Sequence, residues 1–100
     1  MNVIVPKEYL QDIDSVFSVI EDIAVTNSLM RPGDMKLNKA KKLGIGEAPV
    51  TLFVASSVIV WFTKKWADTY LWPEIQKKID SPSKAIIDWL VRIIEKHKGE

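Results

Sequence analysis

Residues 49–62 read PVTLFVASSVIVWF, and residues 63–75, which follow at once, read TKKWADTYLWPEI. The first stretch is the most apolar run of the chain. Sixteen uncharged residues separate Glu47 from Lys64, and as a helix they would span about 24 Å. A bilayer core is about 30 Å thick and usually takes about 20 apolar residues. The run is therefore short for a membrane span, and its length is typical of a buried core helix.

The start of this run is ambiguous in its secondary structure. Val50 and Thr51 are β-branched and favour a strand, but a short apolar run does not by itself distinguish a strand from a helix. We expect a helix from about Ser56 onward, with Ser56 or Ser57 as its N-cap. Residues 50–54 stay open between a short buried strand and the first turns of that helix.

We expect the same helix to continue through the aromatic residues that follow. On a helical wheel at 100° per residue, the apolar side chains form two lines. The core-facing line consists of Leu52, Ala55, Ile59, Phe62, Trp66 and Tyr70. The second line consists of Val54, Val58, Trp61, Trp72, Ile75 and Ile79. Proline lacks a backbone N–H and disrupts a helix interior, so Pro73 predicts a break or kink at 69–73.

The N-terminal residues predict a short strand and then a helix. Residues 2–5 (NVIV) are apolar and stop at Pro6, which suits the first position of a helix. Residues 50–54 are the expected pairing partner of 2–5, and a parallel pairing is expected because the intervening chain is long enough for a crossover. The helix after Pro6 has apolar residues at spacings of three and four. They are Leu10, Ile13, Phe17, Ile20 and Ala24.

Two further helices complete the predicted fold. Asp34 is a good N-cap for a short basic helix that ends at Leu43, before a loop at 44–49. Ser81 and Pro82 suit the start of a last amphipathic helix that reaches Lys96, with Trp89 on its wet side. The predicted fold is therefore mainly α: a single domain (residues 1–100), a small bundle of about four helices, with a minor parallel β pairing of 2–5 with 50–54 as an optional addition.

Charge is unevenly distributed along the chain, although the net charge is only +1. Residues 1–30 carry one lysine against five acidic residues, and residues 31–47 carry five basic residues against two acidic ones. This layout suits packing or self-association between the acidic and the basic parts. The low net charge gives no strong field that would attract nucleic acid, and we expect no nucleic-acid partner.

The residue types that support catalysis or metal binding are scarce. The chain has no cysteine, which excludes disulfides and thiolate metal sites, and its single histidine, His97, lies where chain ends fray. Ser56 and Ser57 have no base near them in sequence. We therefore expect no catalytic residues, no cofactor and no metal. The N-terminal residues lack the basic and long apolar regions of a signal peptide, so a cytoplasmic location is expected.

Aromatic density is the feature that points to function. Six of the nine aromatic residues fall within twenty residues: Phe53, Trp61, Phe62, Trp66, Tyr70 and Trp72. A small domain has one core, and on a continuous helix Trp61 and Trp72 project within about 20° of each other, away from the core-facing line. Lys65 and Asp68 lie between them. Trp, Tyr and charged residues together are typical of interfaces, so the candidate interface is Trp61, Lys65, Asp68 and Trp72.

These observations favour a non-enzymatic protein-interaction or assembly module that uses its aromatic-rich central helix. The expected partner is another copy of the chain or another protein. The alternative is a small membrane-associated protein in which residues 48–66 insert into or span a bilayer, because Trp and Tyr beside lysines also occur at membrane interfaces.

Overall fold

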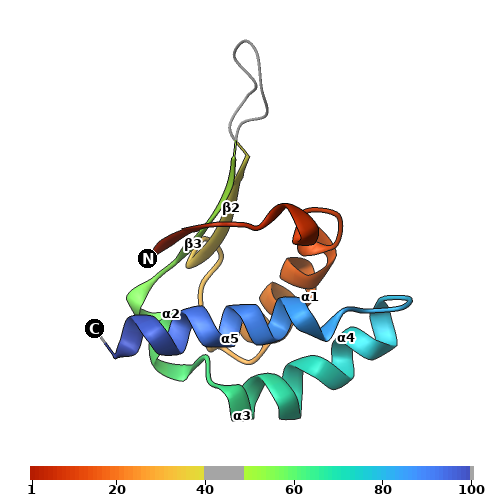
Figure 1. Ribbon diagram of the computed structural model, residues 1–100. Helices are drawn as coiled ribbons and strands as arrows, with labels where there is room; N and C mark the ends of the chain where they lie inside the picture. Colours follow the sequence, from red (N-terminus) through yellow and green to blue (C-terminus); the bar gives the residue numbers. More distant parts are fainter. Residues whose placement is uncertain (40–48, 100) are drawn as a thin grey trace.

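The computed structural model describes residues 1–39 and 49–99 and places the helices below and beside a small sheet (Figure 1). The fold is mainly helical, as predicted. In chain order the elements are β1 (Asn2–Ile4), the 3-10 helix η1 (Lys7–Tyr9), α1 (Ile13–Thr26), β2 (Met35–Lys39), β3 (Val50–Val54), α2 (Ser56–Trp61), α3 (Lys64–Trp66), the π-helical turn η2 (Ala67–Leu71), α4 (Trp72–Lys78) and α5 (Lys84–Lys98).

Within the described residues, three strands form one antiparallel sheet in the order β1-β3-β2. Leu52 of the central strand lies between Val3 on one side and Leu37 on the other. The predicted pairing of 2–5 with 50–54 is confirmed, but its parallel direction was wrong. The strand reading of 50–54 is the correct one of the two that the sequence left open.

The direction differs because the segment between the two predicted strands contains β2. β2 pairs antiparallel with β3, and β1 pairs antiparallel with β3 on its other edge. β1 and β2 therefore run the same way, and the chain reverses between β2 and β3. The one described strand parallel to β1 is β2, and β3 lies between them, so β1 and β2 do not pair.

The short basic helix predicted from Asp34 is wrong in its described part, which is β2. Met35 is buried while Lys36 is exposed, which is the alternation of a half-buried strand. Asp34 accepts a hydrogen bond from the Arg31 N–H at 3.0 Å, so it closes a turn before the strand. The predicted helix end at Leu43 and most of the predicted loop lie outside the described residues.

The first long helix buries most of the line that its periodicity predicted. Ile13, Ile20 and Ala24 are buried, whereas Phe17 is only half-buried. The helix begins at Ile13 and not at Pro6, because the residues after Pro6 first form the 3-10 turn η1.

The central stretch bends earlier than predicted. A helix does begin at Ser56, as expected, but its N-cap is Ala55, and neither serine provides a side-chain cap. The helix ends at Trp61, and Phe62 and Thr63 are extended. Of the break or kink predicted at 69–73, the break does not occur, and the helix instead changes there from the π-helical turn η2 to α4.

Helix continues past Pro73 because the turn before it is wider than an α-turn. The Trp72 N–H donates to the carbonyl of Ala67, five residues earlier, in the π-helical turn η2. Pro73 then falls in the first turn of α4, where the proline ring and its missing N–H are tolerated. From Lys64 to Lys78 the chain is helical without an extended residue.

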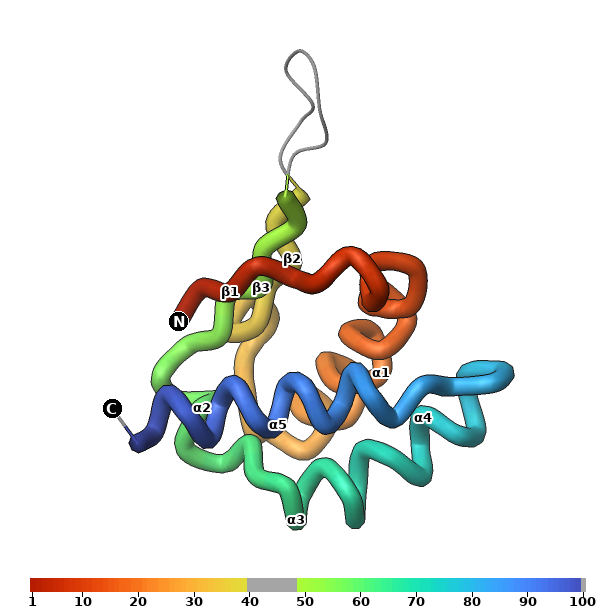
Figure 2. The backbone as a smooth tube through the Cα atoms, viewed as in Figure 1, coloured from red at the N-terminus to blue at the C-terminus, as the bar shows by residue number. Residues whose placement is uncertain are grey.

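The last helix crosses the front of the molecule in Figures 1 and 2, with β1 above it and α3 and α4 below it. Its N-cap is Ser83, two residues later than the predicted cap at Ser81, whose φ of 50° is left-handed. Trp89, predicted on the wet side, is half-buried, and its ring centroid lies 5.6 Å from that of Tyr9. The 3-10 turn η1 therefore covers part of this helix.

Phe62 is the largest fully buried side chain, and its removal is expected to destabilise the fold strongly. Phe62→Ala should lower the free energy of unfolding by about 3–5 kcal/mol, because it deletes a buried ring and leaves a cavity. Phe17→Ala is the matched control and should cost clearly less, since Phe17 is half-buried. Urea denaturation of both variants measures the difference, and equal losses would contradict this view of the core.

Candidate interaction site

The helical segment from α3 to α4 presents three lines of side chains with different environments. Ala67, Leu71 and Ile75 are fully buried and hold the segment against the core. Trp66 and Tyr70 lie on one flank of this line, and Tyr70 is 60% exposed. This flank, next to α1, carries the candidate site.

Asp68 and Trp72 lie on the opposite flank, next to α5. A carboxylate oxygen of Asp68 lies 3.5 Å from the Lys84 ammonium at the start of α5. Trp72 is half-buried and packs against the core. The neighbouring helix α5 therefore covers part of this flank.

Trp66 belongs to an aromatic cluster, in which its ring packs against those of Trp61 and Phe62. The ring centroids of Trp61 and Trp66 are 4.8 Å apart in an edge-to-face arrangement, and those of Phe62 and Trp66 are 5.4 Å apart. The rings meet because the extended residues 62–63 turn the chain between α2 and α3. Such aromatic pairs contribute about 0.5–1.5 kcal/mol each beyond their burial.

Two details show how this cluster is held. The Thr63 hydroxyl oxygen accepts a hydrogen bond from the Trp66 N–H at 3.1 Å, which caps α3 and fixes the backbone beside the Trp66 ring. The Trp61 indole N–H is buried and has no hydrogen-bond partner among the described residues. An unpaired buried donor costs about 1–3 kcal/mol, so ring packing must offset that cost.

Trp66 of the aromatic cluster also lines a cleft between the end of α1 and the segment from α3 to α4. The cleft has a volume of about 540 Å³. Its lining residues are Ile23, Asn27, Leu29, Trp66, Tyr70 and Glu74. Asn27 donates from its side-chain amide to the Ile23 carbonyl at 2.7 Å, which fixes the α1 side of the cleft. The walls are mostly apolar, and the phenol and a carboxylate provide polar contacts.

The structure does not bring the four sequence-predicted interface residues onto one helical face. Trp61 is separated from Lys65, Asp68 and Trp72 by the bend at residues 62–63. Trp61 is half-buried in the aromatic cluster, and Lys65 is exposed. The wheel that placed Trp61 beside Trp72 assumed one continuous α-helix, and that assumption was wrong.

Sequence reasoning missed Tyr70, which the wheel placed on the core-facing line. The wheel assumed one helix through residues 62–63, but the extended residues there reset the rotation, so that Ala67 is buried in place of Trp66. The buried residue at this level is Leu71. Pro73 was the one sequence signal that this helix departs from ideal geometry, because a proline inside a helix requires a local change such as the π-helical turn.

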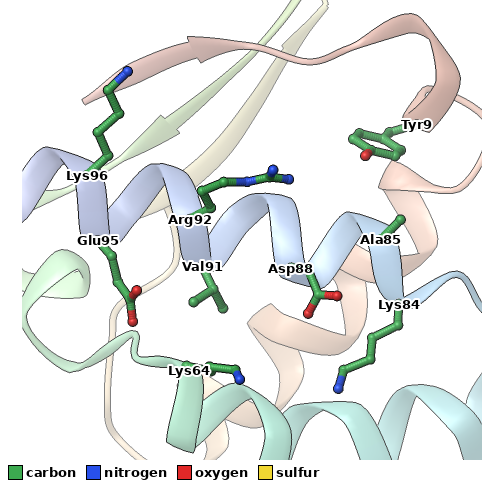
Figure 3. Close-up of a pocket in the computed structure, with 9 residues that line it drawn as sticks. All are labelled: Tyr9, Lys64, Lys84, Ala85, Asp88, Val91, Arg92, Glu95 and Lys96. Atoms are coloured by element: carbon green, nitrogen blue, oxygen red, sulfur yellow. The ribbon is translucent and has the colours of Figure 1, made fainter.

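A larger and more polar groove lies along the exposed side of α5, with a volume of about 860 Å³ (Figure 3). Arg92 extends toward Tyr9, while Asp88, Glu95 and Lys84 point to the other side, toward the segment from α3 to α4. The acidic side chains dilute the basic ones, and Lys84 is already paired with Asp68. The groove therefore shows no clear preference for an anionic or a cationic ligand.

The described part of the chain contains neither a metal-binding cluster nor a membrane-spanning helix. In residues 1–39 and 49–99, no group of three or more His, Cys, Asp or Glu side chains could hold a metal ion. Across the same ranges, no helix has the length and apolar character needed to cross a membrane.

Comparison with protein-family models found no match, and comparisons with curated proteins and with solved structures found none either.

The Thr63 cap is expected to position Trp66. Thr63→Ala should lower the free energy of unfolding by about 1 kcal/mol, a common cost of losing an N-cap, because the Trp66 N–H loses its acceptor. It should also alter the tryptophan fluorescence of the folded protein. Thr63→Ser keeps the hydroxyl and should resemble the wild type in both measurements. Equal behaviour of the alanine and serine variants would exclude this role of the cap.

Proposed function

We propose that the chain is a non-enzymatic protein-interaction module whose aromatic-rich central segment binds a partner protein at the cleft beside Trp66 and Tyr70. The observation that carries the proposal is the 60% exposure of Tyr70 next to a half-buried tryptophan at the wall of an open, mostly apolar cleft. Trp and Tyr in such positions commonly dominate binding energy at interfaces.

The packing of the Trp66 ring supports this function. The Trp66 ring is packed by Trp61 and Phe62, and its backbone is fixed by the Thr63 cap. A side chain that is already ordered loses little conformational entropy on binding. The cleft volume lies within the range of about 300–1,000 Å³ that is usual for binding pockets, and an inserted side chain needs only part of it.

The chemistry of the cleft favours a partner segment that inserts an apolar side chain beside a basic residue. Ile23, Leu29 and Trp66 provide the apolar contact. Glu74 is half-buried, and its carboxylate contacts the ammonium of the exposed Lys77 only at 3.4 Å. A basic side chain of the partner can replace this weak surface pair.

The site can be tested by placing a photoreactive aryl-ketone amino acid at single positions of the full chain in its native host. A crosslinker at Tyr70 should capture a partner, because that side chain lies at the cleft and is exposed. Gln76 is the matched control, since it is exposed on the following helix and does not line the cleft. Lys65 tests the face that the sequence predicted.

The captured protein is then purified and its affinity measured. Tyr70→Ala should weaken binding by about 2 kcal/mol, or about thirtyfold in Kd, with the helical circular dichroism signal unchanged. Capture at Lys65 alone would move the interface to the sequence-predicted face. Equal capture at Tyr70 and Gln76, or an unchanged Kd for Tyr70→Ala, would reject the cleft.

The membrane alternative for residues 48–66 predicts a different result in the same host. The chain should then be recovered in the membrane pellet and should bind vesicles that contain acidic lipids. Recovery of the chain and of its crosslinked partner in the aqueous fraction supports the interaction module.

A further inference from the structure

β1 has one edge paired with β3 and one edge that is open. The Met1 amino group donates to the Val54 carbonyl at 2.9 Å, and the Val54 N–H donates to the Met1 carbonyl at 2.8 Å. The Val5 N–H donates to the Val50 carbonyl at 2.9 Å. In an antiparallel pair, residues that hydrogen-bond to the neighbouring strand alternate with residues whose N–H and C=O groups point away from it. Met1 and Val5 bond to β3, so the backbone groups of Asn2 and Ile4 point away from β3.

These outward groups pair with no other strand of the described chain. Figure 2 shows β1 passing in front of β2 and β3, and no other described segment crosses in front of it. The N–H groups of Asn2 and Ile4 make no hydrogen bond with another described residue. The open edge therefore offers two donors and two acceptors.

The two edge strands of the described sheet differ in charge. β2 carries Lys36 and Lys39, and lysines on an edge discourage pairing with another chain. β1 (Asn2–Ile4) has no charged side chain. Pairing two copies through β2 would place lysines near lysines, whereas pairing through β1 brings no like charges together within the strands.

The outer face of the sheet carries two large apolar side chains near β1, Ile4 and Phe53. Ile4 is 67% exposed, although it is a large aliphatic residue. It pairs with Thr51, and Phe53 lies two residues further along β3 on the same face. Phe53 is half-buried and lies outside the hydrophobic core. This apolar surface continues to the open edge.

We propose that β1 is a self-association edge and that its occupant is β1 of a second copy of this chain. Two identical strands that pair antiparallel obey a two-fold axis, and here the axis passes through Val3. The Asn2 N–H then donates to the Ile4 carbonyl of the second copy, and the Ile4 N–H of the second copy donates to the Asn2 carbonyl. Symmetry repeats both bonds, so every outward group of β1 is paired.

The side chains fit the same register. Val3 of each copy meets Val3 of the other on the axis, in a non-hydrogen-bonded pair where side chains are closest. Ile4 becomes enclosed between Thr51 of its own copy and Asn2 of the second copy. The sheets of the two copies join into one sheet, and the apolar strip of Ile4 and Phe53 continues across the axis.

Light-scattering mass on size exclusion tests the proposal with the full chain. The wild type should show about twice its monomer mass of 11.4 kDa at high concentration. Ile4→Lys should return the mass to that of the monomer, because it places a charge on each side of the joined edge. Val60→Lys is the matched control, since Val60 is a 77% exposed aliphatic residue on α2, and it should leave the dimer intact.

Asn2→Pro provides a second variant that acts through the backbone. It removes an N–H that only the dimer uses, and proline is tolerated on an edge strand, so the monomer fold should persist and the dimer should weaken. Circular dichroism confirms that each variant is folded.

Three results would overturn the proposal. One is a wild type that stays monomeric at millimolar concentration. Another is a dimer that survives both Ile4→Lys and Asn2→Pro. The third is a dimer that Val60→Lys or Tyr70→Ala dissolves, which would place self-association on another surface. Tyr70→Ala should keep the dimer, so failure of the edge and failure of the cleft are distinguished.

Discussion

The burial of Phe62 at an extended bend determines how the two halves of the chain meet. Phe62 has a ψ of 94°, so α2 cannot continue, and its ring is fully removed from solvent. The next residue, Thr63, starts a new helix with its own cap. Because the bend joins the sheet and α2 to the segment from α3 to α4, it also positions the Trp61 and Trp66 rings, and with them the cleft.

The longest elements could be predicted because each buries one face. The apolar spacing of α1 identified Ile13 and Ile20 as buried, and the same principle placed the last helix within two residues of α5. β2 was missed because five residues carry little periodic signal and because lysines after Asp34 are also typical of a helix. The alternation of Met35 and Lys36 was the stronger indication.

The candidate site was less predictable than the fold, because it depends on two local departures from ideal helix geometry. The bend at residue 62 removed Trp61 from the face of Trp72 and reset the rotation of the next helix, so that Leu71 and not Tyr70 is buried. The bend follows from the burial of Phe62, and the π-helical turn then accommodates the ring of Pro73. A helical wheel assigns each residue a fixed rotation and cannot represent either departure.

Two acidic residues of α1 form ion pairs with lysines of other elements. Asp14 of α1 contacts Lys39 of β2 at 2.7 Å, and Asp22 contacts Lys78 of α4 at 3.1 Å. Both pairs are exposed, and such pairs contribute about 0–1 kcal/mol, so they orient the elements around α1 more than they stabilise them. Two other surfaces of the described chain carry little charge. These are the uncharged β1 edge and the mostly apolar cleft at Tyr70, and they belong to different elements. A chain with both could bind a second copy at one and another protein at the other without competition.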